Sequence, residues 1–284
     1  MANTKLEEYI AEEIRKYQGV MVPVKAGFLE RRLTKKAKCS QLHPNPSDEF
    51  CFPDIGPNNQ IISKYVQMIT RYKSLQPNGT EEPIIVEKVS PDGYMILNGH
   101  HRWAAAVKTG FDPVPISIVN LTQESDIQRM IRESGHDKRV TMDLEEVVFC
   151  KEGEPADKAL SFPENKSIRL GIPALLHFLD QQGYDVWVYT ASYYSQDDIE
   201  DAFKKYSVKV AGVITGAARK MKSSAEAQKK AQNLIYGHYH ETLHLDRDMI
   251  LRTWTGSKEF AEYPINAGTE SWSGTVMNIV RTLK

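Results

Sequence analysis

The sequence is poor in cysteine, and it contains no apolar run long enough to span a bilayer. Its three cysteines, Cys39, Cys51 and Cys150, are unevenly spaced and form no C-x-x-C pair. An odd, scattered set argues against a disulfide framework and a zinc site, and it predicts free thiols in a reducing compartment. The first residues also lack an apolar signal core, so we expect a cytoplasmic protein with no membrane partner.

The sequence also lacks a large net charge of either sign. The 36 lysines and arginines nearly balance the 37 aspartates and glutamates, which leaves a formal charge of −1. This balance gives no global electrostatic reason to favour a nucleic-acid partner. The hydrophobic content of 41% is that of a globular protein, and 284 residues are enough for two ordinary domains.

The apolar pattern changes character along the chain. Up to about residue 121, short strands, a hairpin over 83–97 and amphipathic helices indicate a small α+β domain with an N-terminal helix. From 137 onward, apolar strands alternate with helices, which predicts a doubly wound, Rossmann-like α/β sheet. A helix capped by Thr122 separates them. We therefore predict domains over 1–121 and 137–284, joined by a linker helix over 122–136.

One turn of the first domain carries a concentration of polar side chains. The sequence Asn98-Gly99-His100-His101-Arg102 lies between an apolar strand over 94–97 and a helix that ends before Gly110. The free N–H groups at a helix N-terminus favour an anion, and Arg102 adds a fork of donors suited to phosphate. These five residues are therefore candidate phosphate ligands. The alternative is an ordinary solvated turn.

Residues 20–121 resemble the ParB/sulfiredoxin-like superfamily. The resemblance rests on that turn and on two further motifs, Leu42-His43-Pro44-Asn45-Pro46 and Pro83-Ile84-Ile85-Val86. It is greatest to the free-serine kinases of the ParB-like fold, which carry a Gly-His-His-Arg-Trp turn.

This resemblance implies phosphoryl transfer from ATP or ADP to a small substrate. His100 and His101 would contribute to catalysis, and Glu49 or the adjacent Asp48 would act as the base, although these acids also suit a capped loop. Asn98 stands where the kinases have an acidic residue. His100 stands where sulfiredoxins need cysteine, which argues against sulfinic-acid reduction.

Polar side chains follow three predicted strands of the second domain. Asp143-Leu144-Glu145 comes after a strand ending at Met142, Thr190-Ala191-Ser192 after a strand over 186–189, and Asp246 after one over 242–245. The carboxyl ends of adjacent parallel strands converge on one crevice, so we expect these side chains to lie together.

Residues 137–284 resemble a degenerate haloacid-dehalogenase-like (HAD) hydrolase with a minimal cap. The resemblance implies a Mg²⁺ site made by Asp143, Glu145 and Asp246, with Asp143 and Glu145 catalytic and with Thr190 and Ser192 binding phosphate. A family lysine would be one of four: Lys220, Lys222, Lys229 and Lys230. Glu145 is one methylene longer than the family's aspartate. Since about 1 Å of displacement can cost on the order of a hundredfold in rate, we expect weak turnover.

Two functions remain open. The first is a nucleotide-dependent phosphotransferase joined to a phosphatase-type domain of low activity. The second is a ParB-like module that binds nucleotide or nucleic acid, with a nuclease activity implied by the superfamily alone and with a catalytically silent HAD-like scaffold. Asp143 and Asp246 favour the first function, whereas Glu145 and Asn98 favour the second.

Overall fold

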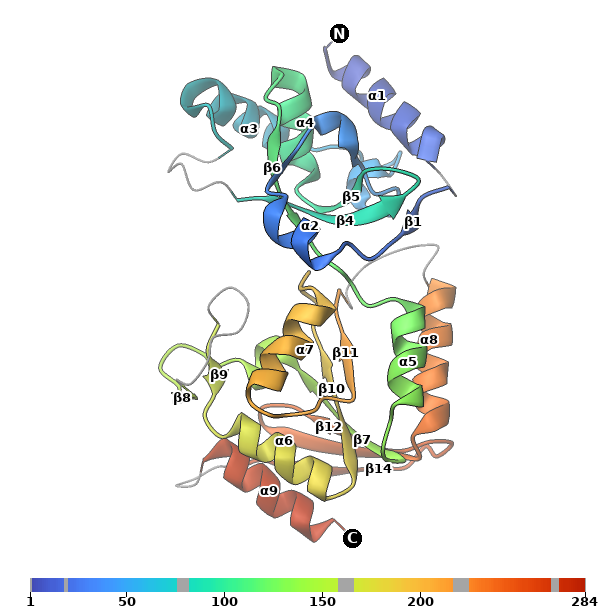
Figure 1. Cartoon of the computed structure of the whole chain (residues 1–284), viewed down its shortest axis with the longest axis vertical. Coiled ribbons are helices and arrows are strands. Elements are labelled where there is room, and N and C mark those ends of the chain that lie inside the picture. The colour runs from blue at the N-terminus through green and yellow to red at the C-terminus, as the bar shows by residue number, and fades with distance from the viewer. Residues whose placement is uncertain are drawn as a thin grey trace. The chain divides into compact units, whose positions relative to one another are not determined.

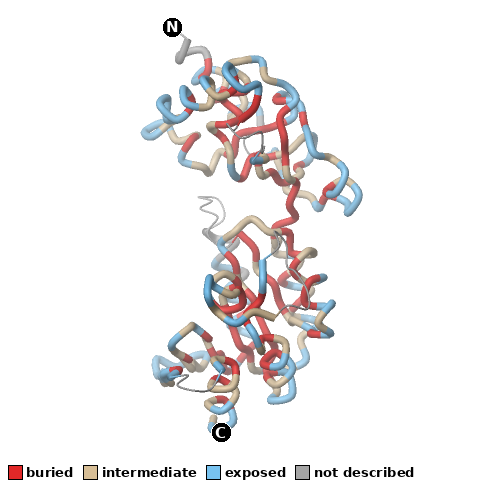
Figure 2. The backbone as a smooth tube through the Cα atoms, turned by 90° about the vertical axis from the view of Figure 1, so that its left-hand side faces the viewer, coloured by how far each residue is buried: buried red, intermediate tan, exposed pale blue. Residues whose placement is uncertain are grey.

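The computed structural model of the chain describes residues 2–17, 20–75, 82–157, 166–216, 225–266 and 271–283. The chain divides into two compact units, of which the first extends to Asn120 and the second begins at Leu121 (Figure 1). Figure 2 shows that the buried residues of each unit follow its strands, with exposed residues on the outer turns and helices.

The first unit combines a mixed sheet with helices. Its helical segments are α1 (Ala2–Tyr17), α2 (Phe28–Leu33), α3 (Asn59–Tyr72), α4 (His100–Thr109) and the 3₁₀ turns η1 (Cys39–Gln41) and η2 (Glu49–Cys51). Its strands are β1 (Val22–Pro23), β2 (Lys36–Ala37), β3 (Leu42–His43), β4 (Ile84–Ser90), β5 (Tyr94–Asn98) and β6 (Val114–Ile118). Their order is β2-β6-β4-β5-β3, with β1 also paired to β4. The predicted hairpin is confirmed as β4 and β5.

Helix α4 places the candidate turn directly against the core of this unit. Trp103 is fully buried and donates its indole N–H to the backbone oxygen of Cys39 at 3.1 Å. Ala104, Ala105 and Ala106 follow it and are also fully buried, because small side chains let the helix approach its neighbours closely. The first turn of α4 is thereby fixed by core packing.

The second unit contains a sheet of order β11-β10-β7-β12-β13-β14. Its strands are β7 (Lys138–Asp143), β10 (Tyr184–Tyr189), β11 (Gly212–Ile214), β12 (Glu241–Leu245), β13 (Met249–Trp254), β14 (Phe260–Pro264) and the separate hairpin β8 (Ala156–Asp157) and β9 (Ile168–Arg169). Its helical segments are α5 (Glu124–Arg132), the π turn η3 (Leu144–Val148), α6 (Ile172–Gln181), α7 (Gln196–Lys205), α8 (Ala225–His238) and α9 (Trp272–Thr282). The first four strands in the order are parallel, as predicted, whereas β13 and β14 extend the sheet antiparallel.

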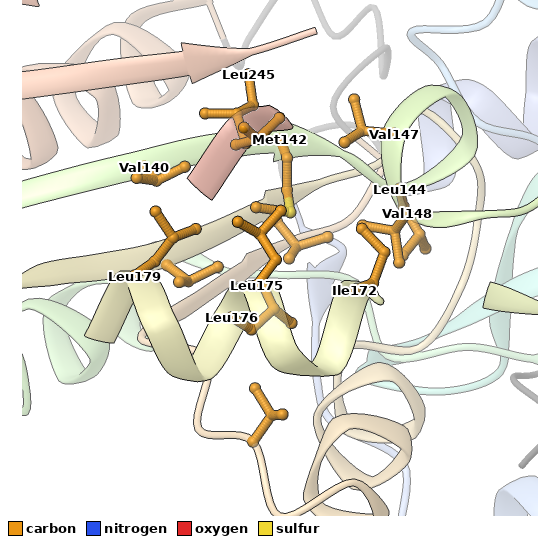
Figure 3. Packing of buried hydrophobic residues seen from close by; sticks show 14 of the residues in the cluster. Val140, Met142, Leu144, Val147, Val148, Ile172, Leu175, Leu176, Leu179 and Leu245 are labelled. Atoms are coloured by element: carbon orange, nitrogen blue, oxygen red, sulfur yellow. The ribbon is translucent and has the colours of Figure 1, made fainter. Parts of the chain in front are cut away.

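The parallel strands of this sheet have two packed faces. Val140 and Met142 belong to the apolar cluster that includes Leu175 and Leu179 of α6 (Figure 3). A smaller cluster packs Trp187 of β10 against α5 and α8. Both faces of the parallel strands are therefore covered, which is typical of a doubly wound sheet.

Helix α5 differs from the predicted linker in two respects. It begins after Gln123, whose backbone N–H donates to Asp126 at 2.8 Å, so Thr122 is not its N-cap. The Thr122 hydroxyl instead donates to the backbone oxygen of Val213 at 2.9 Å. Through Ile127, α5 also belongs to the core of the second unit. The sequence Val20-Met21-Val22-Pro23-Val24 also predicts a strand, of which the structure forms the two-residue β1, paired antiparallel with β4.

Candidate functional site

The turn between β5 and α4 depends on Gly99. This residue has a φ of +103°, a left-handed conformation that glycine adopts at low cost. A Cβ atom here would lie 3.0 Å from two nitrogen atoms of Arg102. Gly99 is thus required both by the turn and by the guanidinium that lies against it.

Arg102 is buried, with 3% of its surface exposed. Its Nη1 donates to the backbone oxygen of Glu82 at 3.1 Å and pairs with the Glu82 carboxylate at 2.8 Å, and its Nη2 donates to Asn98 Oδ1 at 3.0 Å. The Glu82 side chain itself is 58% exposed. The guanidinium at this helix N-terminus is therefore already paired with one carboxylate, whose side chain reaches solvent.

The two histidines of the turn hold backbone segments in place. Nε2 of His100 accepts the backbone N–H of Asn45 at 3.1 Å, and Nε2 of His101 accepts that of Asn58 at the same distance. An accepting Nε2 leaves the proton of a neutral ring on Nδ1. Burial lowers the pKa of His100 to about 4, with Asp48 opposing part of the shift, and burial also lowers the pKa of His101. Near neutral pH both rings supply N–H donors but no positive charge.

Of the two acids expected near this turn, the structure brings Asp48 to it. Asp48 Oδ1 accepts the backbone N–H of Phe50 at 3.0 Å and lies 3.7 Å from Nδ1 of His100. The Phe50 ring stacks on His100 with their centroids 5.3 Å apart. Glu49 is exposed. Asp48 is therefore the carboxylate placed to act with His100.

The same contacts tie two helix N-termini together. Asn58 is the N-cap of α3, and its Oδ1 accepts the backbone N–H groups of Gln60 and Ile61. Through its own N–H, Asn58 is bound to His101 in the first turn of α4. Each helix N-terminus carries partial positive charge, so the arrangement favours an anion.

In the second unit, the strand register aligns the predicted polar residues. Asp143 pairs with Tyr189, and Met142 pairs with Leu245. Asp143, Thr190 and Asp246 therefore lie at the carboxyl ends of the three neighbouring strands β7, β10 and β12.

Two carboxylates at this edge lie side by side. Thr190 is fully buried, and its hydroxyl donates to Oε1 of Glu145 while accepting the backbone N–H of Ser192 at 3.0 Å. Oε2 of Glu145 is buried without a hydrogen-bond partner. Burial raises the pKa of Asp143 and the charge of Glu145 raises it further, while the hydrogen bond from the backbone N–H of Glu146 opposes part of this shift. A cation between Asp143 and Glu145 would relieve both the repulsion and the unsatisfied oxygen.

The third predicted ligand lies farther out. Asp246 is exposed, and its Oδ1 accepts the backbone N–H of Arg247 at 2.7 Å. Within the described ranges, no group of three or more histidine, cysteine, aspartate and glutamate residues is arranged to hold a metal ion. The pair Asp143 and Glu145 nevertheless fits Mg²⁺, which commonly uses one or two carboxylates together with water and phosphate.

The lysine implied by the HAD-like resemblance is not assigned. Lys220 and Lys222 lie outside the described residues. Lys229 is an exposed residue of α8, and the neighbouring Lys230 pairs with Glu124 of α5 at 2.7 Å.

A sequence model of the ParB N-terminal domain matches residues 59–135. The match runs from the first residue of α3 through the turn at Gly99 and includes α5, which supports the ParB-like resemblance. It does not extend to Asp48, nor to the carboxylates of the second unit. A search of curated proteins finds no match to the chain. Among the described helices, none is long and apolar enough to cross a membrane.

Proposed function

We propose that the first unit binds the phosphates of a nucleotide, ATP or ADP, at the N-terminus of α4. The observation that carries this proposal is the Arg102 guanidinium, which lies against Gly99 and is paired with the exposed carboxylate of Glu82. Phosphate oxygens can replace that carboxylate while also accepting the free N–H groups of the first helical turn. His101 would add its Nδ1–H.

Phosphoryl transfer is the reaction that these residues suit best. Asp48 would accept the proton of a substrate hydroxyl, whose oxygen then bonds to the terminal phosphorus of the nucleotide. The bond from that phosphorus to its bridging oxygen breaks, and the nucleotide leaves one phosphate shorter. The backbone N–H of Phe50 orients the Asp48 carboxylate, and Nδ1 of His100 lies 3.7 Å from it. This chemistry depends on positioning and charge neutralisation.

Calorimetric titration with ADP and ATP tests the binding step. Charge-assisted hydrogen bonds contribute about 1.5–3 kcal/mol, so Arg102→Ala should weaken binding roughly 10- to 150-fold. The nucleotide affinity of Arg102→Lys should lie between those of the wild type and Arg102→Ala, because lysine keeps the positive charge and lacks the forked pair of donors. Arg71→Ala is the matched control, since Arg71 lies in the last turn of α3. Unchanged nucleotide affinity in a folded Arg102→Ala protein would overturn the proposal.

We also infer a HAD-like, Mg²⁺-dependent phosphate site in the second unit. The unsatisfied Oε2 of Glu145 beside Asp143 carries this second candidate. When bound, Mg²⁺ would neutralise phosphate charge. Asp143 and Glu145 would hold it, Asp246 would be the third ligand that the HAD-like resemblance implies, and Thr190 and Ser192 would bind phosphate. We expect slow turnover, because Glu145 is long and its Oε1 is engaged by Thr190.

Titration with MgCl₂ tests this second site. Asp143→Asn should abolish Mg²⁺ binding, whereas Asp201→Asn, a control at an exposed carboxylate of α7, should leave it unchanged. Equal Mg²⁺ affinity in the wild type and in Asp143→Asn would remove the second candidate. Nucleotide binding without phosphoryl transfer or hydrolysis would instead support the alternative of a binding module with a silent scaffold.

A further inference from the structure

We propose that Arg247 and Arg169 are positioning residues, which fix the carboxylate edge of the second unit through the backbone of Glu146. This inference rests on the Mg²⁺ site proposed above. Neither arginine is itself expected to contact the ion. Their role is to set where Asp143, Glu145 and Asp246 stand relative to one another.

The backbone of Glu146 is the centre of the arrangement. Its N–H donates to Oδ1 of Asp143 at 2.8 Å. Its carbonyl oxygen accepts Nη1 of Arg247 and Nη2 of Arg169, both at 3.3 Å. One peptide segment, next to Glu145 in sequence, is therefore held from the Asp143 side by a carboxylate and from the other side by two guanidinium groups.

Arg247 links two strand ends. It directly follows Asp246 at the end of β12, and its Nη2 forms an ion pair with Oε1 of Glu154. The other oxygen of Glu154 accepts the backbone N–H of Lys151 at 2.9 Å. The segment that follows β7 is thus fastened to the end of β12. Movement of Arg247 would change the separation of Asp246 from Asp143.

Arg169 completes the arrangement from β9. It is 5% exposed, its Nε lies 3.6 Å from Oε2 of Glu154, and its guanidinium lies 4.6 Å from the ring centroid of Trp272. The indole N–H of Trp272 donates to the backbone oxygen of Arg247 at 2.7 Å. Two arginines, one glutamate and one tryptophan thereby form a closed set of contacts, which we call the arginine clasp.

The clasp should affect metal affinity more than folding. Residues that orient metal ligands commonly change affinity about 10- to 100-fold when they are removed. The Arg247–Glu154 pair is partly exposed, with side chains 30% and 27% accessible, so solvent screens it and it should contribute little to stability. Arg247 is the better residue to change, because its side chain is 30% exposed whereas Arg169 is nearly buried.

The experiment is a double-mutant cycle on the full chain with MgCl₂ as the probe. Arg247→Ala, Glu154→Gln and the double variant are titrated with Mg²⁺, and the melting temperature of each metal-free protein is measured. We expect each single variant to lose at least about tenfold in Mg²⁺ affinity and the double variant to lose no more than either. Arg247→Lys should restore part of the loss.

The control cycle uses an ion pair away from this edge. Lys204 and Asp201 of α7 form an exposed pair at 3.0 Å, and Lys204→Ala and Asp201→Asn should leave Mg²⁺ affinity unchanged. Wild-type affinity in Arg247→Ala, with Asp143→Asn unable to bind, would overturn the clasp alone. A wild-type protein without Mg²⁺ affinity would overturn the proposed site and the clasp together. The clasp would also be overturned if Mg²⁺ affinity fell only in variants whose melting temperature fell, and in proportion to that fall.

Discussion

The two candidate sites hold their polar groups by different means. In the first unit, neutral imidazoles accept backbone N–H groups and a single guanidinium carries the charge. In the second unit, carboxylates gather at strand ends and ion pairs hold the surrounding segment. The first site suits an anion, because it places a guanidinium at a helix N-terminus. A site built from carboxylates needs a cation before it can accept phosphate.

The difference extends to how each site is coupled to its core. In the first unit, Arg102 and the core residue Trp103 are adjacent on α4. In the second unit, Asp143 lies one residue beyond the core residue Met142, and the clasp supplies the remaining support. Damage to either core should therefore reach the adjacent site, and the second site depends in addition on its ion pairs.

The largest expected effect is that of Trp103→Ala. Removing this buried ring should cost about 3–5 kcal/mol of unfolding free energy, and nucleotide binding should weaken with it. Denaturant unfolding and calorimetry measure both quantities. Trp103→Phe should lose much less unfolding free energy, because phenylalanine keeps most of the buried volume. A loss below about 1 kcal/mol in Trp103→Ala would break the proposed coupling between core and site.

The next largest effect is expected from a change of pH. The pKa of His100 is lowered from 6.5 to about 4, so the ring is neutral when folded and protonates when unfolded. Stability should therefore fall by about 3 kcal/mol as the pH falls from 6.5 to 4, and then level off. In the second unit, burial also lowers the pKa of His244, so that unit loses stability below pH 6.5 as well. The pKa of Glu241 is lowered by Arg252 and Tyr184, so its contribution is lost only below about pH 4.5.

The variant His100→Gln checks the assignment of this pH dependence. Glutamine has no proton to gain in this range, so the variant should lose the share of the fall that His100 contributes, while His101 and His244, whose pKa values burial also lowers, keep theirs. Unfolding free energies of both proteins at several pH values give the comparison. If the two curves run parallel, His100 is not the group responsible.

An intermediate effect is expected for Glu145→Asp in the second unit. Shortening the side chain by one methylene brings it to the length of the family's aspartate, and it should release Thr190. Phosphate-ester hydrolysis with Mg²⁺ should then rise, by roughly tenfold to a hundredfold, because about 1 Å of displacement matters on that scale. Fast hydrolysis by the wild type would show that the longer side chain is no obstacle.

The smallest effect is expected for Glu82→Gln. The Glu82 carboxylate competes with phosphate for Arg102, and its side chain is 58% exposed. An exposed ion pair contributes about 0.2–1 kcal/mol, so removing the competing charge should tighten ADP binding about 1.4- to 5-fold. Glu49→Gln, at an exposed acid near the same turn, is the control. Weaker ADP binding in Glu82→Gln would mean that Glu82 supports the site.

Local features of both sites follow from the sequence. The strand, Gly99 and the following helix are adjacent in the chain, so their pattern predicts the turn. The apolar runs before Asp143, Thr190 and Asp246 likewise predict strands whose ends align. Local propensity and strand alternation decide these features, and both can be read from neighbouring residues.

The supporting contacts do not follow from the sequence. Nε2 of His100 binds a backbone N–H 55 residues away, and Arg247 binds Glu154 across 93 residues. Backbone partners leave no side-chain signal, and surface charges have many candidate partners. The choice of Asp48 over Glu49 depends on the conformation of η2. Strands β13 and β14 escaped prediction because their residues are only partly buried, which weakens the apolar pattern.

The central claim is that phosphate binds at the first turn of α4, and backbone amide NMR during an ADP titration tests it most directly. We predict saturable shifts of the His100, His101 and Arg102 amide resonances, and their loss in Arg102→Ala. The amides of Asp143 and Thr190 should stay unchanged without Mg²⁺. Saturable ADP binding that leaves the three α4 amides unmoved would contradict the account.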